Sequence, residues 1–160
     1  MTDNELKQKL DSIATGPSHV AAAVAGLSDA TLRYQPASGK WSILEILGHL
    51  ADIEVVYVYR LRQMLADKEP AIAPIEQDDW ARHLGYLEAS PAELLEAYQT
   101  ARRANFRLLR RLKPADLEKG AFHPEFKRKV TVGDLIGMMA GHDPDHRGQI
   151  ERLKEQAKAA

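Results

Sequence analysis

Apolar residues recur every three or four positions along most of this chain, the period of one face of an α-helix. Four segments carry this pattern, and each opens with a capping box, in which a Ser or Thr precedes an acidic residue by three positions. These boxes are Thr2–Glu5, Ser42–Glu45, Ser90–Glu93 and, with Asp in place of Glu, Thr131–Asp134. We therefore predict four long helices at about residues 3–26, 42–67, 90–112 and 132–157.

Proline and glycine mark the connections between the predicted helices. The pair Gly16-Pro17 falls inside the first helix, where we expect a break because proline lacks the amide donor of a helix interior. No segment shows sustained alternation of polar and apolar residues, so no sheet is predicted. The sequence thus predicts an all-α fold, a four-helix bundle with long connections, in a single domain of residues 1–160.

Composition narrows the class of protein. The chain is 44% hydrophobic and 28% charged, with a formal net charge of −1, which gives no reason to expect nucleic acid or an anionic membrane as a partner. No apolar run approaches the length of a membrane span, and the N-terminus lacks the apolar region of a signal peptide, so we expect a cytoplasmic protein. The sequence leaves a homodimer open.

The chain has no cysteine, which excludes disulfides, thiolate ligands and a cysteine nucleophile. Any thiol chemistry must use a thiol from solution.

Two histidines occupy apolar positions of the last predicted helix. Leu135, Met139, His142, His146, Gln149 or Ile150, and Leu153 step by three and four, so both imidazoles lie on the buried face, one turn apart. One interpretation is a pair of core histidines, each bonded to a backbone carbonyl. The other is a pair of metal ligands, which we favour because a buried imidazole needs a partner for each ring nitrogen.

A third histidine extends the metal hypothesis. His49 lies on the face of Ile46 and Ile53 in the second predicted helix, again beside the apolar stripe. Ligands that project inward from facing helices are a common way to build a site inside a bundle. Three protein ligands with open positions are typical of catalytic rather than structural metal sites. We therefore predict one divalent ion on His49, His142 and His146, with zinc or nickel favoured over iron or copper.

Four polar residues near these histidines are candidates for supporting roles or for contact with substrate. Asp52, one turn after His49, either orients a ligand ring or is a solvated carboxylate, and we expect it not to bind the metal directly. Glu54 and Arg60 are candidates for contact with substrate, but an internal ion pair with Arg103 is the simpler expectation for Glu54. Gln149 either lines the cavity or bonds to the backbone.

Several other polar residues are expected to lie away from any site. Asp143 and Asp145 alternate with the candidate ligands, so we expect them to face outward. Pro144 lies between the same ligands, where it either widens a metal pocket or bends the helix around the core. The residues expected at the surface or in loops are His19, His83, His123 and the pairs Arg102-Arg103 and Arg110-Arg111.

Two motifs together resemble a known family. Trp41-Ser42-Ile43 leads to His49, and the closing segment 141–150 reads Gly-His-Asp-Pro-Asp-His-Arg-Gly-Gln-Ile. Their order and separation are similar to those of the DinB/YfiT-like superfamily, and the resemblance runs from about residue 27 to 153. It implies a four-helix bundle with a divalent metal on the same three histidines. Characterised members include thiol-dependent transferases and isomerases, and many others are described as metal-dependent hydrolases.

Three functions remain open at this point. The chain is either a metal-dependent hydrolase of a small molecule, or a transferase that presents a low-molecular-weight thiol to an electrophile, or a non-catalytic metal-binding or small-molecule-binding module. The first two need the same three histidines. Neither a Ser–His–Asp array nor a His-Glu-x-x-His motif is present to favour hydrolysis.

Overall fold

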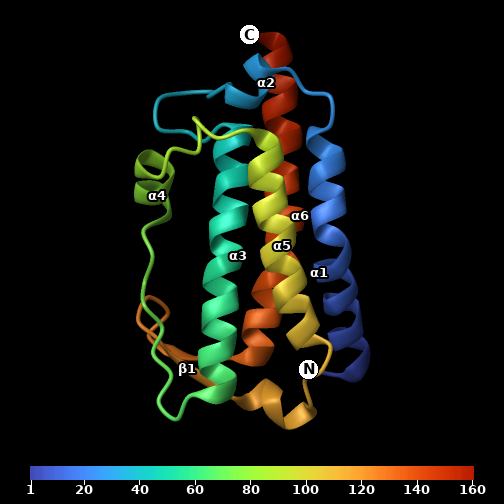
Figure 1. Ribbon diagram of the computed structural model, residues 1–160, viewed down its shortest axis with the longest axis vertical. Helices are drawn as coiled ribbons and strands as arrows, with labels where there is room; N and C mark the ends of the chain where they lie inside the picture. The colour runs from blue at the N-terminus through green and yellow to red at the C-terminus, as the bar shows by residue number, and fades with distance from the viewer.

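Four long helices form a bundle in the computed structural model, which describes all 160 residues (Figure 1). They are α1 (Asp3–Val24), α3 (Ile43–Ala66), α5 (Pro91–Leu109) and α6 (Val132–Ala159). Both α1 and α3 pack against α5 and α6, so α1 and α3 occupy opposite corners. The all-α four-helix prediction is confirmed. The short elements are α2 (Asp29–Arg33), α4 (Gln77–His83) and a 3₁₀ turn, η1 (Pro114–Glu118).

Helix directions explain the longest connection. In Figure 1, α1 and α6 run towards one end of the bundle, and α3 and α5 run towards the other. Because α3 and α5 are parallel, residues 67–90 must return along the outside of α3 before α5 can begin. We call this segment the strap. It carries α4, which lies beside the upper half of α3.

The helices begin where the capping boxes predict. The side chains of Thr2, Ser42, Ser90 and Thr131 each accept a hydrogen bond from the backbone N–H three residues later. These bonds satisfy donors that the first helical turn leaves free. All predicted helix ends lie within three residues of the observed ones.

The predicted break in the first helix is wrong, because α1 continues through Pro17. Proline at this position cannot donate to the carbonyl of Ile13, four residues earlier. That carbonyl instead accepts a hydrogen bond of 2.8 Å from Nη1 of Arg102 on α5. The helix therefore survives because a neighbouring helix supplies the missing donor, which local sequence cannot reveal.

A neighbouring helix also supplies the missing donor at the second internal proline. Pro144 leaves the carbonyl of Ala140 in α6 without its helical donor, and α6 is nevertheless continuous. The hydroxyl of Ser12 on α1 donates to this carbonyl at 2.9 Å. Each proline thus frees a carbonyl that ties its helix to another one.

A small sheet is present that the pattern did not predict. Strands β1 (Gly120–His123) and β2 (Arg128–Thr131) form an antiparallel hairpin between η1 and α6, with Ala121 opposite Val130. The burial along β1 does alternate, but its exposed residue is Phe122 and a buried one is His123. An apolar residue is exposed and a polar residue is buried, so the sequence of this four-residue strand does not show the usual alternation of buried apolar and exposed polar positions.

A polar layer divides the core of the bundle into two apolar clusters. The buried residues of α3 show the division, since Leu44 and Leu50 belong to one cluster and Tyr57 and Leu61 to the other. The layer lies near mid-height, and its buried polar side chains come from α3, α5 and α6. They are His49, Glu54, Arg102, Asn105, Asp143 and His146.

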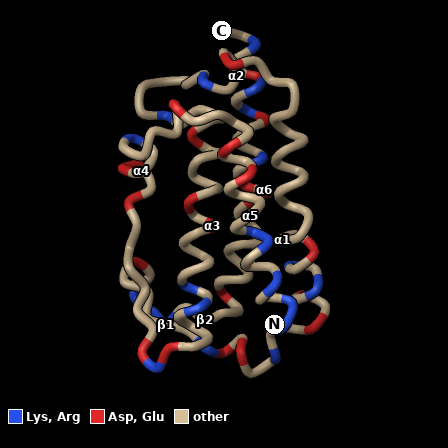
Figure 2. Tube along the Cα trace, in the orientation of Figure 1, with Lys and Arg blue, Asp and Glu red and all other residues tan.

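Charges of both signs occur on each long helix (Figure 2). This distribution agrees with a net charge close to zero and presents no helix of a single sign. None of the helices has the length and apolar character needed to cross a membrane.

Candidate metal centre

Three imidazoles meet at one point of the polar layer. His142 and His146 project from one face of α6, as their spacing predicts, and His49 projects from α3. Nε2 of His142 lies 3.1 Å from Nε2 of His49 and 3.1 Å from Nε2 of His146. His49 and His146 are buried, and His142 is half-buried. The structure therefore brings the three predicted ligands together.

The protonation of these rings suits metal binding. Burial, with the neighbouring imidazoles, lowers the pKa of His49 to about 3, and burial foremost lowers that of His142 to about 3. Burial also lowers the pKa of His146. Neutral imidazole is the form that binds a metal. The three rings are therefore ready to bind at neutral pH.

A hydrogen bond fixes the tautomer of one ring. Nδ1 of His146 donates to Oε1 of Gln149 at 2.8 Å, so Nε2 carries the lone pair. Gln149 thus orients a candidate ligand instead of bonding to the backbone. A polar partner of this kind is usual for metal-binding histidines.

The donor geometry fits a shared cation. Zinc binds imidazole nitrogen at about 2.0–2.1 Å, so two ligands of one ion lie about 3–3.4 Å apart. The two nitrogen separations of 3.1 Å meet this requirement. Without a cation, Nε2 of His142 faces two other ring nitrogens and its buried Nδ1 has no partner. Three facing nitrogens with too few hydrogens between them are best satisfied by a positive ion.

An ion-pair network lies directly behind the histidines. The guanidinium of Arg102 contacts both oxygens of Asp143, at 2.7 and 3.0 Å, and Oε2 of Glu54 at 2.9 Å. All three side chains are buried. Burial opposes the charge of Arg102, but the two carboxylates hold its pKa above the usual value.

The network corrects three predictions. Asp143 faces inward, Arg102 is buried, and Glu54 pairs with Arg102 and not with Arg103. Arg102 lies three to seven residues from Tyr98, Asn105 and Leu109, on the buried face of α5, whereas Arg103 is rotated towards solvent. The Asp-His alternation did not indicate this, because Asp143 has its partner on another helix.

Two further contacts complete the network. Nδ2 of Asn105 donates to Oε1 of Glu54 at 2.6 Å and to its backbone carbonyl. On α1, a Cβ at Gly16 would lie 1.8 Å from Oδ2 of Asp143. The absence of a side chain at Gly16 therefore makes room for the carboxylate. Together these contacts join all four long helices next to the candidate ligands.

Asp52 takes part in a different contact. Its Oδ2 accepts a hydrogen bond of 2.6 Å from the hydroxyl of Tyr86, a residue of the strap. The ring of Tyr86 covers Gly48, where a Cβ would lie 2.3 Å from it. The strap is thus fastened to α3 beside His49. Sequence reasoning did not predict the Tyr86–Asp52 hydrogen bond, although Gly48 inside a helix was a signal that something approaches closely.

Two other polar residues lie outside the histidine cluster. Nη2 of Arg60 donates to the carbonyl of Ala73, so this side chain also holds the strap. His123 is buried, contrary to the prediction, and stacks on Phe126 of the hairpin with ring centroids 4.2 Å apart. Neither residue is among the candidate metal ligands.

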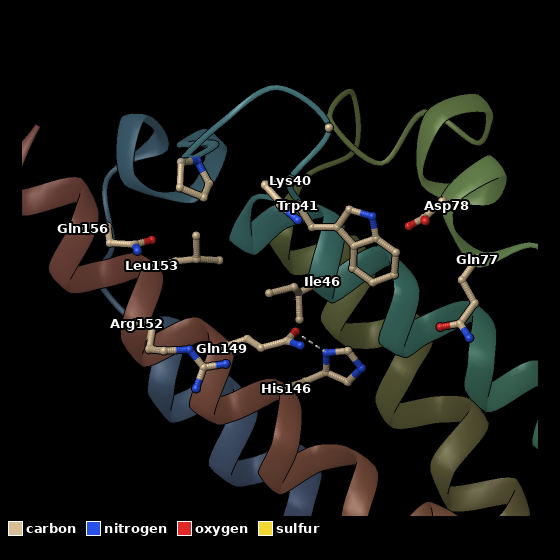
Figure 3. A pocket seen from close by; sticks show the side chains of 12 residues that line it. Lys40, Trp41, Ile46, Gln77, Asp78, His146, Gln149, Arg152, Leu153 and Gln156 are labelled. Carbon is tan, nitrogen blue, oxygen red and sulfur yellow. Dashed lines mark hydrogen bonds between the residues drawn. The ribbon is translucent and has the colours of Figure 1, made fainter.

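One of the three histidines, His146, lines an open pocket of about 530 Å³ (Figure 3). Its floor is formed by His146, and the Trp41 ring lies nearly parallel to that imidazole with centroids 6.5 Å apart. The Trp41 ring also lies 4.9 Å from the His49 ring, measured between centroids, so it lies beside two of the three candidate ligands. The other lining residues are mainly polar and come from α6, α4, the start of α3 and the loop before it. They are Pro36, Gly39, Lys40, Ile46, Gln77, Asp78, Gln149, Arg152, Leu153 and Gln156.

Comparison with known sequences gives a consistent family. Residues 13–150 match the sequence profile of the DinB superfamily. The chain is 26% identical over 140 residues to a Bacillus subtilis protein named "Putative metal-dependent hydrolase YfiT". The aligned residues make up 88% of this chain and 79% of that protein. It is 27% identical over 154 residues to an Oceanobacillus iheyensis protein named as a metal-dependent hydrolase, covering 96% and 88%.

Solved structures show the same fold. The structure of YfiT from Bacillus subtilis, described as "a probable metal-dependent hydrolase with an unusual four-helix bundle topology", superposes with a TM-score of 0.90 at 23% identity, over 97% of this chain and 89% of that one. A mycothiol-dependent maleylpyruvate isomerase superposes with a TM-score of 0.72 at 14% identity, over 92% and 62%. These similarities establish the bundle topology.

Proposed function

Because the chain belongs to the DinB superfamily, we propose that it is a metal-dependent enzyme that acts on a small molecule. In this proposal His49, His142 and His146 hold one divalent ion at the floor of the pocket. The observation that carries it is the convergence of three neutral ring nitrogens from α3 and α6. The names of the relatives, as metal-dependent hydrolases, support the same conclusion.

The donor set determines the chemistry that an ion supplies. Three neutral imidazoles leave positions for other ligands and leave the charge of a divalent ion uncompensated, so the ion is a Lewis acid that lowers the pKa of a water or thiol. Zinc and nickel are the ions we favour for this site.

The residues of the chain then have distinct tasks. Gln149 holds the His146 ring in the tautomer that presents Nε2. Trp41 forms an aromatic wall over the imidazoles, which orients a substrate and limits access of water. Asp52 stays outside direct metal contact, since its carboxylate is not part of the histidine cluster and one of its oxygens accepts the Tyr86 hydroxyl. The network around Arg102 holds the segment of α6 that carries both histidines.

Hydrolysis is the reaction that we propose first, on the names of the relatives. Thiol transfer is the second candidate. It is favoured by the fold shared with a mycothiol-dependent isomerase and by a pocket large enough for a small thiol beside the histidines. Since the chain has no cysteine, that thiol must come from solution.

The test is metal-dependent turnover. Protein loaded with zinc or nickel is assayed against a panel of small esters, lactones and amides, and separately against an electrophile with several thiols. We expect turnover in one panel, its loss on chelation, and its loss in His142→Ala. The matched control is His83→Ala, an exposed histidine on α4, which should keep full activity. Equal turnover by both variants, or by the metal-free protein, would contradict the proposal.

A further inference from the structure

The pocket beside His146 has an uneven charge. Its charged side chains are Lys40 from the loop before α3, Arg152 from α6 and Asp78 from α4. Figure 3 shows Arg152 on the α6 side, beside Gln149, and Asp78 on the opposite side, beyond Trp41. Two cations and one carboxylate leave the pocket with a net positive charge, although the whole chain carries a net charge of −1.

Both cations are free to bind a ligand. Neither Lys40 nor Arg152 forms an ion pair or donates a side-chain hydrogen bond within the protein. The other basic residues of the last two turns of α6 behave differently, since Lys154 pairs with Glu151 and Lys158 with Glu155. The two pocket cations therefore have no partner within the protein that a ligand would have to displace.

The rest of the lining also offers donors. Oε1 of Gln149 is engaged by His146, which leaves its amide nitrogen as the free group (Figure 3). Gln77 and Gln156 add further amides. Guanidinium and amide donors match the oxygens of carboxylate and phosphate groups, and charge-assisted bonds of this type are strong.

From this arrangement we propose that the pocket binds a substrate or co-substrate with an anionic group, a carboxylate or phosphate. Arg152 and Lys40 bind that group at the rim, and the Gln149 amide assists them. The reactive part of the molecule then lies at the histidines, with Trp41 against its apolar portion. The inference rests on the proposed function and adds the chemical class of the molecule. It makes Arg152 and Lys40 determinants of specificity.

A titration with small thiols of different charge tests the assignment. Cobalt-substituted protein is titrated with 3-mercaptopropionate, which is anionic, 2-mercaptoethanol, which is neutral, and cysteamine, which is cationic, and binding is followed by the cobalt absorption spectrum. The thiols differ in basicity, so their affinities are not compared with one another directly. For each thiol we compare the ratio of its affinity for the wild type to its affinity for a Lys40→Gln/Arg152→Gln variant. We expect this ratio to be about 10 for 3-mercaptopropionate, close to 1 for 2-mercaptoethanol and below 1 for cysteamine.

The control variant is Lys158→Gln, which removes a cation of α6 outside the pocket and should leave all three affinities unchanged. Ratios near 1 for all three thiols, with cobalt and thiol bound normally, would overturn the inference and leave the proposed function intact. Failure of the wild type to bind cobalt would instead count against the proposed function.

A second measurement does not depend on the metal. Metal-free protein is titrated with inorganic phosphate and with acetate, which distinguishes phosphate from carboxylate preference, while the Trp41 indole N–H signal is followed by NMR. We expect a saturable shift with at least one anion, and its loss in Lys40→Gln/Arg152→Gln. Absence of a saturable shift with both anions, or a shift that persists in the variant, would overturn the inference.

Discussion

Arg102 is the residue on which the polar layer most depends. Its guanidinium is the only cation in contact with the buried carboxylates of Glu54 and Asp143. Replacing it with methionine leaves two buried carboxylates without a cation, so we expect Arg102→Met to lower the free energy of unfolding by about 3–5 kcal/mol. Urea denaturation measures the change. Arg103→Met, at the exposed neighbouring position, should stay within about 0.5 kcal/mol, and equal effects of the two variants would contradict the account.

Gly16 provides a second test at the same scale. A methyl group there would collide with Oδ2 of Asp143, so we expect Gly16→Ala to destabilise the protein by about 1–3 kcal/mol in urea denaturation. Gly141 is also helical, and no atom lies within 4 Å of the position its Cβ would take. Gly141→Ala should therefore stabilise the helix by about 0.5–1 kcal/mol. Similar changes at both glycines would show that Asp143 does not need the space beside α1.

At the scale of helices, the two internal prolines act through neighbouring helices. Ser12 donates to the Ala140 carbonyl that Pro144 leaves free. We expect Ser12→Ala to cost about 1 kcal/mol in the natural sequence. In a Pro144→Ala background the cost should be much smaller, because the new N–H can donate to the same carbonyl. A double-mutant cycle in urea measures this coupling, and the same cost in both backgrounds would refute it.

Whether an element could be predicted depends on whether the residues that determine it are close together in the sequence. Capping boxes and apolar periodicity are local, so the four helix starts could be predicted closely. The continuity of α1 through Pro17 depends on Arg102, which is 85 residues further along the chain. The hairpin was missed because its strands are four residues long and expose Phe122 while burying His123.

The candidate site divides in the same way. His142 and His146 could be predicted because a polar residue in an apolar helical stripe is a local anomaly, and the resemblance supplied the same set with His49. Asp143 and Arg102 could not be predicted, since each looks like an ordinary charged surface residue until the partner helix is placed. The pocket cations also carry no local signal, because the loop and α6 meet only in the folded bundle.

At the scale of the whole molecule, buried tyrosines are expected to lower the stability of the protein at alkaline pH. Burial raises the pKa of Tyr57 to about 12 and raises that of Tyr98 further, whereas an unfolded tyrosine ionises near pH 10. The native state keeps protons that the unfolded chain loses, so this contribution is complete below about pH 10 and is lost as pH rises through the native values. Urea denaturation from pH 8 upward should show the decline, and a shallower one in Tyr57→Phe. An equal slope in both proteins would contradict the assignment.

The central claim is that the polar layer is built around one divalent ion held by three histidines. Metal content after equilibration with zinc and removal of free ion tests it most directly, on protein without an affinity tag at neutral pH. We predict one ion per chain in the natural sequence and in the exposed-histidine control His83→Ala, and none in His142→Ala, because two imidazoles rarely hold a divalent ion tightly. Circular dichroism should show that the variant remains helical, since the two apolar clusters form without the ion. Full zinc content in a His49→Ala/His142→Ala/His146→Ala protein would contradict the account.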